Sequence, residues 1–155
     1  MSMIFRTAGI LAGLLLVAAR AEAQLPSTGY VSSFGGVSLS GQCVPNARKL
    51  GDVFVRKTLP YLGSNGVAAD LWNNYGGFQR INRISNGNVK MPPKFAFIIW
   101  SKSLGGTGHV AMVVGSVDGT KKIVRVVDTN WDNRGSGMIH DVNLNDSRIL
   151  GYLVP

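Results

Sequence analysis

One cysteine in this sequence has the type and position of a catalytic nucleophile. Cys43 is the only cysteine among 155 residues, so it cannot form an internal disulfide. Pro45 follows closely, and proline fits a helix only in its first turn, which places Cys43 at a helix N-terminus. Such a position favours the thiolate, the form of cysteine that attacks carbonyl groups. The alternative is that Cys43 serves as a small buried hydrophobe.

A predicted β-hairpin brings the partners that such a nucleophile needs onto one face. Strands are expected at 109–117 and 121–130, joined at an Asp-Gly turn. A two-residue turn sets His109 opposite Asp128, and a four-residue loop sets it opposite Asn130. Because side chains repeat every two residues along a strand, either register places all three on one face, unless a bulge intervenes.

A histidine oriented by a carboxylate or an amide is fixed in one tautomer and can act as a general base. If the N-terminus of the helix packs against the start of the 109–117 strand, Cys43, His109 and Asp128 or Asn130 form a thiol hydrolase site. The alternative for the polar residues is simple solvation of a strand end.

The elements that must position these residues follow in a simple order. Residues 24–37 are expected as an irregular lead-in and 73–91 as a loop rich in Asn and Gly. Helices are expected at 45–57 and 67–72 from the spacing of apolar residues. The chain then turns to β structure, with strands expected at 95–100, 109–117, 121–130, 138–144 and 148–154. This order predicts an α+β fold with N-terminal helices packed on a C-terminal antiparallel β-meander or half-barrel.

The N-terminal residues predict export. Arg6 precedes an apolar run at 8–19, and Ala21-Glu22-Ala23 has the small-x-small pattern of a signal peptidase site. The run is shorter than the roughly 20 apolar residues of a membrane span. We therefore interpret 1–23 as a signal peptide, with the mature chain in the periplasm or secreted and without stable membrane insertion after cleavage.

Composition narrows the remaining functions. The chain carries a net charge of +8, and its basic residues are scattered. This favours an anionic polymer such as the cell wall as partner, while no basic run or motif indicates nucleic acid. Residues 24–155 contain no Glu, which disfavours a two-carboxylate glycosidase. The two histidines and one cysteine lack zinc spacing, so no metal or cofactor is expected, and His140 is interpreted as a surface or strand-pairing residue.

Several short motifs occur in the order typical of one enzyme family. Gly41-Gln42-Cys43-Val44, followed by Arg48, resembles the nucleophile segment of the CHAP family of cysteine- and histidine-dependent amidohydrolases/peptidases. Further segments are similar to the family's second helix, histidine strand, following strand and closing strand, at 68–72, 106–113, 126–131 and 151–153. The resemblance covers about 38–155, which we interpret as one CHAP-like catalytic domain.

The resemblance implies a papain-like fold and hydrolysis of a peptidoglycan amide, by an N-acetylmuramoyl-L-alanine amidase or a peptide endopeptidase. By this resemblance Cys43 attacks the carbonyl, His109 activates the thiol and protonates the leaving amine, and Asp128 with Asn130 orients the imidazole.

The same resemblance assigns the surroundings of the reacting atoms. The backbone N–H of Cys43 and the side chain of Gln42 are the oxyanion donors it implies. Trp131 and Trp72 are expected to line the cleft.

Two alternatives remain open from the sequence. Transglutaminase-like or deamidating enzymes also use Cys, His and Asp in this chain order. A non-catalytic wall-binding module on the same fold would keep the basic surface without a reactive thiol. Peptidoglycan is the expected partner, a cognate inhibitor or immunity protein is compatible with this function, and a monomer is expected.

Overall fold

The computed structural model describes residues 24–155, so the predicted signal peptide at 1–23 lies outside the described residues. One α-helix, α1 (Cys43–Val55), and one 3₁₀ helix, η1 (Ala68–Trp72), accompany the strands. The strands are β1 (Gly29–Val31), β2 (Ser33–Phe34), β3 (Val37–Ser38), β4 (Gln79–Asn82), β5 (Ile84–Ser85), β6 (Asn88–Val89), β7 (Phe97–Trp100), β8 (His109–Asp118), β9 (Ile123–Thr129), β10 (Gly137–Asn143) and β11 (Ile149–Val154).

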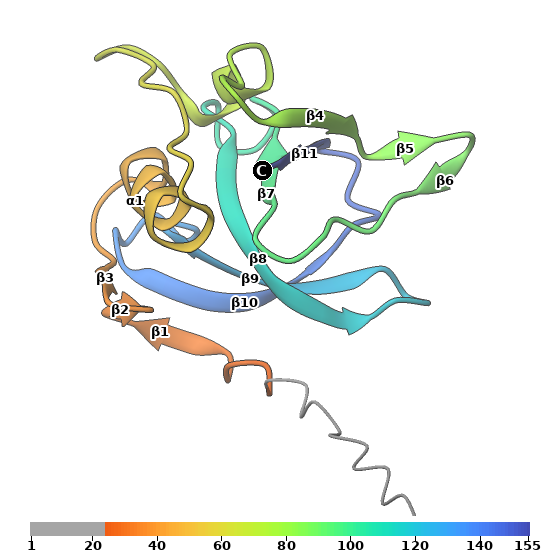
Figure 1. Cartoon of the computed structure of the whole chain (residues 1–155), viewed down its shortest axis with the longest axis horizontal. Helices are drawn as coiled ribbons and strands as arrows, with labels where there is room; N and C mark the ends of the chain where they lie inside the picture. Colours follow the sequence, from red (N-terminus) through yellow and green to blue (C-terminus); the bar gives the residue numbers. More distant parts are fainter. Residues whose placement is uncertain (1–23) are drawn as a thin grey trace, which may run out of the picture.

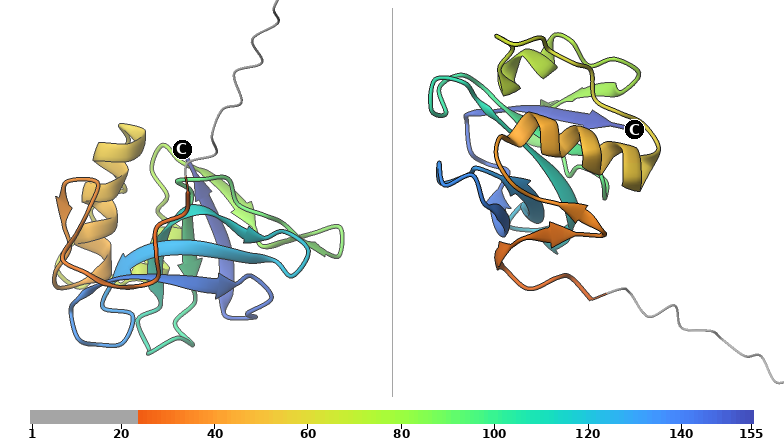
Figure 2. Two further views of the ribbon diagram at one scale, coloured as in Figure 1. Left: turned by 90° about the horizontal axis from the view of Figure 1, so that it is seen from below. Right: turned by 90° about the vertical axis from the view of Figure 1, so that its left-hand side faces the viewer.

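A seven-stranded antiparallel sheet dominates the structure, in the order β1-β10-β9-β8-β7-β11-β4 (Figure 1). Two short ladders, β2-β3 and β5-β6, stand outside it. Helix α1 packs on β8 and β9 beside the curved sheet (Figures 1 and 2). This packing fixes the position of the helix relative to β8, the strand that begins with His109.

The expected fold class is wrong in its helices. N-terminal helices packed on a β-meander, as in a papain-like fold, were expected, but α1 is the only α-helix within residues 24–155. The second expected helix forms only the five-residue η1. It does not extend into a regular α-helix because Gly66 lies directly before its N-cap and two asparagines follow Trp72, and these residues favour helices poorly. The fold is α+β with few helices and a large antiparallel sheet.

Two segments expected without regular structure contain strands. The lead-in supplies β1, which pairs with β10 through Tyr30 opposite Met138. The Asn-rich segment supplies β4, an edge strand paired with β11, and the β5-β6 hairpin. Asn86 and Gly87 both have positive φ in that hairpin, as the two central residues of a type I′ turn require. This Asn-Gly pair is a signal by which the hairpin could have been predicted.

Apolar side chains cover both faces of the sheet. One face packs against α1 through residues such as Leu50, Met112 and Val127. The other face forms a second core that includes Ala111 and Val126. Every residue of β7 is buried, as expected for a central strand covered on both sides.

The β8-β9 hairpin contains two register shifts. Near the sheet centre Met112 lies opposite Val127. Toward the hairpin turn, β8 has one extra residue at Val114 and a second at Val117, and each of them shifts the pairing with β9 by one residue. Each single bulge exchanges the face to which following side chains point. Two of them restore the original alternation, so His109 and Asp128 point to the same face.

Helix α1 contains a buried glycine that its packing requires. A Cβ atom at Gly51 would lie 2.6 Å from the carbonyl oxygen of Lys57, which follows the left-handed C-cap Arg56. The close return of the chain therefore explains a residue that is usually unfavourable in a helix interior.

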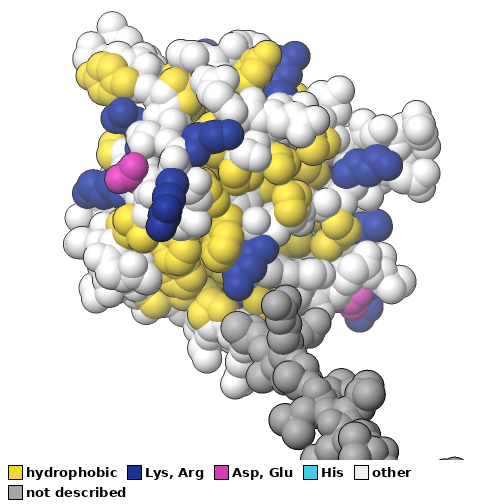
Figure 3. Space-filling view, in the orientation of Figure 1, with side chains coloured by type: hydrophobic (Ala, Val, Ile, Leu, Met, Phe, Trp, Pro, Cys, Tyr) yellow, Lys and Arg dark blue, Asp and Glu magenta, His cyan; other side chains and the backbone are white. Residues whose placement is uncertain are grey.

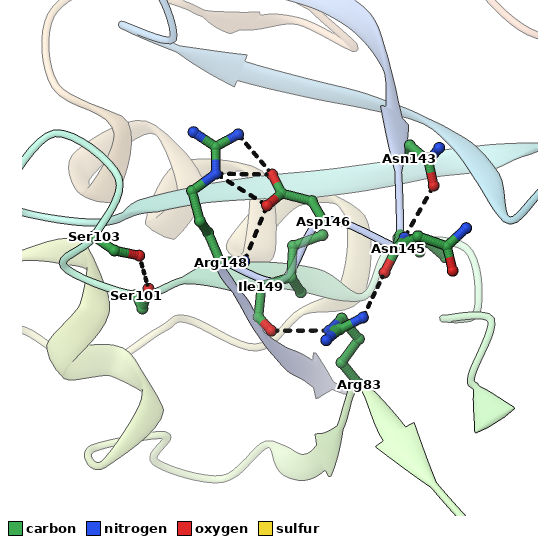
Figure 4. Close-up of polar contacts among 9 residues, drawn as sticks. Arg83, Ser101, Ser103, Asn143, Asn145, Asp146, Arg148 and Ile149 are labelled. Carbon is green, nitrogen blue, oxygen red and sulfur yellow. Dashed lines mark hydrogen bonds and ion pairs between the residues drawn. The ribbon is translucent and has the colours of Figure 1, made fainter. Parts of the chain in front are cut away.

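Polar contacts close the connection between β10 and β11 (Figure 4). Arg148 forms an ion pair with Asp146 at 2.8 Å, and Arg83 donates to the carbonyls of Ile149 at 3.2 Å and Leu144 at 3.3 Å. These contacts hold the turn between β10 and β11 in place and join it to Arg83, which directly follows β4.

No helix within residues 24–155 combines the length and apolar character needed to cross a membrane.

Candidate active site

Cys43 is the first residue of α1 and is partly exposed. The chain before it is held on the 135–136 segment, where Gly41 N–H donates to the carbonyl of Gly135 at 2.7 Å and Ser40 bridges Ser136. The unpaired N–H groups and the dipole of the helix N-terminus stabilise negative charge at this position. The sequence expectation for the location of Cys43 therefore matches the placement in the structure.

Asn46 ties the start of α1 to β9. Its side chain is buried, and Nδ2 lies 2.6 Å from the carbonyl oxygen of Ser40, 2.8 Å from that of Gln42 and 3.2 Å from Oγ1 of Thr129. Thr129 directly follows Asp128 on β9. Sequence reasoning missed Asn46, although a polar residue on the buried face of a helix is a signal that could have found it.

His109 is the first residue of β8 and is buried. Its Nε2 lies 2.8 Å from Oδ2 of Asp128. Nδ1 is then the ring nitrogen left for Cys43, which lines the same cavity as the imidazole. Gly108 precedes His109 with φ +72°, and a Cβ there would lie 2.4 Å from the carbonyl oxygen of Trp100.

The imidazole of His109 holds its proton strongly. Burial lowers its pKa, but the hydrogen bonds to Asp128 and Cys43 and the negative charges of both outweigh burial and raise the pKa of His109 to about 9. At neutral pH the site therefore favours an imidazolium beside Cys43.

Asp128 accepts hydrogen bonds from two histidines on one oxygen. Oδ2 lies 2.8 Å from Nε2 of His109 and 2.9 Å from Nε2 of His140, and the Asp128 side chain is 0% exposed. Burial raises the pKa of Asp128, but the hydrogen bonds and charges of His109 and His140 lower it below the ordinary value. The carboxylate is therefore ionised and holds both rings in a fixed orientation.

His140 is a second residue that sequence reasoning missed. Of the two expected positions, surface or strand-pairing, the second is right: His140 lies on β10 opposite Val126, with Met138 opposite Asp128, and it is buried. Two-residue alternation puts His140 and Asp128 on the same face as diagonal neighbours. The register of β9 with β10, which the loop between them sets, brings these two residues together.

The two predicted tryptophans have different positions. Trp131 packs its ring on His140 at 4.6 Å and on His109 at 5.1 Å between centroids, and it lines a cavity with Cys43. Trp72 lines none of the four described cavities. It lies beneath the guanidinium of Arg80, and a Cβ at Gly151 would lie 2.5 Å from its ring.

Asn130 contacts Gln42 instead of the imidazole. Its Nδ2 donates to Oε1 of Gln42 at 3.2 Å, and its Oδ1 accepts from the N–H of Gly135 at 2.8 Å. Its left-handed backbone, with φ +63°, turns the chain away from β9. Asp128 therefore orients His109, whereas Asn130 fixes the amide of Gln42 so that the Gln42 Nε2 donor stays available.

Two cavities meet at the thiol. A cavity of about 120 Å³ is lined by Cys43, His109, Asn130 and Trp131. A larger cavity of about 360 Å³ lies next to it and shares Gln42, Cys43 and Thr107 with the first. An elongated substrate could therefore place a bond over Cys43 and extend a part into each cavity.

Within residues 24–155 no group of three or more His, Cys, Asp or Glu side chains is arranged to hold a metal ion.

Comparison with known proteins gives a likeness of fold. No protein-family model and no curated protein matches the sequence. A structure of Ly7917 matches 80% of this chain with a TM-score of 0.53 and 15% identity. A structure described as Ly7917 with the hydrolyzing product of MDP matches with a TM-score of 0.53 and 14% identity. The matched part spans 57% and 58% of those chains, so this chain shares the fold of little more than half of Ly7917.

Proposed function

We propose that this protein is a CHAP-type cysteine hydrolase that cleaves an amide bond of peptidoglycan. The observation that supports this function is that Cys43 and His109 line one cavity, with His109 hydrogen-bonded to the buried carboxylate of Asp128. A nucleophile, a general base and an orienting carboxylate within hydrogen-bonding reach are the minimum set for thiol-dependent acyl transfer.

The first chemical step follows from the positions of these groups. With the Cys43 proton already held on Nδ1 of the His109 imidazolium, Sγ of Cys43 attacks the amide carbonyl carbon and forms a C–S bond. The negative oxygen of the tetrahedral intermediate accepts hydrogen bonds from the backbone N–H of Cys43 and from Nε2 of Gln42. His109 then protonates the amide nitrogen, the C–N bond breaks, and the amine leaves a thioester behind.

The second step releases the acid. Water attacks the thioester carbonyl while His109 accepts one of its protons. The C–S bond then breaks, which releases a carboxylic acid and restores the Cys43 thiolate beside the protonated His109. Asp128 keeps its charge throughout and holds the ring that carries the proton in both directions.

Peptidoglycan as the substrate is supported by the fold neighbour and by charge. We take MDP to mean muramyl dipeptide, a fragment of peptidoglycan, in the Ly7917 structure that contains its hydrolyzing product. Lys and Arg side chains are spread over the face shown in Figure 3, where acidic side chains are few. A scattered positive surface attracts an extended anionic polymer, and the N-terminal signal pattern would deliver the enzyme to it.

The experiment compares wild-type protein with Cys43→Ala on purified cell wall. Mass spectrometry of the soluble fraction should find muropeptides with wild type and none with Cys43→Ala, while both proteins unfold at the same temperature. Undiminished release by Cys43→Ala would refute the mechanism. Incubation with a glutamine-containing protein and an amine separates this function from a transglutaminase or deamidase, which would modify the glutamine.

A further inference from the structure

The two cavities beside Cys43 differ in the catalytic groups that line them. The smaller one contains the imidazole of His109, together with Asn130 and Trp131. The larger one contains Cys43 and Gln42 but not His109, and extends along α1 to Arg48 and across to Tyr61 and Val67. Cys43 therefore lies between a cavity that contains His109, the proposed general acid, and a cavity that does not.

The direction of proton transfer determines how a substrate lies across this boundary. His109 must protonate the leaving nitrogen, so the amine part of the substrate lies in the smaller cavity, next to the imidazole. The acyl part, which becomes attached to Cys43, extends in the opposite direction. It therefore occupies the cavity of about 360 Å³.

Arg48 is the one charged side chain among the residues that line this larger cavity. Its Nε donates to the carbonyl of Leu59 at 2.8 Å, and its guanidinium lies 5.5 Å from the centre of the Tyr61 ring. Within the described part of the chain its two terminal nitrogens have no hydrogen-bond or ion-pair partner. A guanidinium held in this way is preorganised to bind a carboxylate with two parallel hydrogen bonds.

We infer that the larger cavity binds the acyl part of the substrate and that Arg48 recognises a free carboxylate on it. This inference rests on the proposed hydrolysis of peptidoglycan and selects the class of bond. The acyl group of a muramoyl–alanine bond is a lactyl ether without a free carboxylate, because its single carboxyl forms the amide. Stem peptides do carry free carboxylates, so the geometry points to a peptide endopeptidase.

The test uses two muramyl stem peptides that differ in one group. One carries γ-linked D-glutamate with a free α-carboxylate, and the other carries the carboxamide D-isoglutamine. In cleavage at the γ-linked bond or further along the stem, this group belongs to the acyl part. Wild type should cleave the carboxylate peptide with a kcat/KM roughly tenfold or more above the carboxamide peptide, as a lost charged hydrogen bond would produce.

Two variants separate recognition from structural support. Arg48→Gln should bring the ratio of the two kcat/KM values close to one by slowing only the carboxylate peptide. Lys49→Gln removes an equal charge from the next residue, which is exposed, and should leave the ratio unchanged. A ratio near one in wild type, or equal slowing of both peptides by Arg48→Gln, would overturn the inference.

The products distinguish failure of this inference from failure of the proposed function. Release of the whole stem peptide from muramic acid would leave the hydrolase in place and overturn the endopeptidase assignment. If wild type cleaves neither peptide, the hydrolase proposal fails, and calorimetric binding of the same peptides decides about Arg48. Tighter binding of the carboxylate peptide that disappears in Arg48→Gln would support the recognition site, and equal binding would overturn it.

Discussion

Replacement of Asp128 by Asn would test how the site holds its proton. The change keeps the size of the side chain but removes the charge that faces His109 and His140. The amide oxygen of Asn can still accept hydrogen bonds from the two imidazoles, but it carries no charge to favour their protonated forms. The burial that lowers the pKa of His109 remains in the variant.

The structure gives the size of the expected effect. The pKa of His109 is about 9, compared with 6.5 for a free imidazole, which corresponds to roughly 3 kcal/mol in favour of the charged ring. Without the hydrogen bond and charge of Asp128, the pKa should fall from about 9 toward 6.5. Loss of an oriented, charged ring should lower kcat by roughly 10²–10⁴-fold, the usual contribution of a positioned acid–base group.

Two measurements check this reasoning. NMR titration of His109 reports its pKa directly, and the rate of Cys43 alkylation by iodoacetamide between pH 5 and 10 reports the thiolate that the imidazolium stabilises. Asp141→Asn is the matched control, because Asp141 is an exposed carboxylate of the same sheet paired with Arg125 at 2.7 Å. If His109 still titrates near pH 9 in Asp128→Asn, Asp128 is not the source of the raised pKa.

Four further outcomes are expected. His140→Leu should lower kcat about tenfold and the free energy of unfolding by about 1–3 kcal/mol, because Asp128 loses a buried hydrogen-bond partner. His140→Gln can still donate to Asp128, so it should recover part of the activity and part of the stability in urea unfolding. Asn46→Ala should cost about 1–3 kcal/mol in urea unfolding, because the buried Asn46 side chain and its hydrogen bonds to Ser40, Gln42 and Thr129 are lost. Gly108→Ala should lower the thermal midpoint and kcat together, because φ +72° and the adjacent carbonyl exclude a methyl group. The raised pKa of His109 adds stability that is fully present below pH 6.5 and is lost as pH rises to about 9. The free energy of unfolding should therefore fall between these pH values, and a constant value would contradict the raised pKa.

The parts of the site that follow strict periodicity could be predicted from the sequence. The placement of His109 and Asp128 on one face needed only the alternation of a hairpin, and the two bulges left that alternation intact. The start of α1 at Cys43 followed from the restriction that proline places on a helix.

The parts that depend on irregular backbone could not be predicted in this way. Between β9 and β10, Asn130 and Asn133 both adopt left-handed conformations, which turn Asn130 toward Gln42 and away from His109. The contact of His140 with Asp128 depends on how this same loop sets the register of β10. A local pattern of two or three residues carries too little information to fix such a path.

The short strands escaped prediction for a related reason. β1 to β3 and β4 to β6 each contain two to four residues, below the length at which alternation can be distinguished from chance. Trp72 was placed in the cleft by resemblance alone, but tertiary packing against Gly151 and Arg80 determines its position.

The paired bulges of β8 also limit how this protein can change its length. Loss of either extra residue, Val114 or Val117, would shift β8 and β9 by one position, so that His109 and Asp128 would point to opposite faces of the sheet. Changes of two residues would keep both on the same face, as would any change confined to the loop 119–122. Insertions and deletions in this hairpin that preserve catalysis should therefore occur in even steps, whereas those at its tip can have any size.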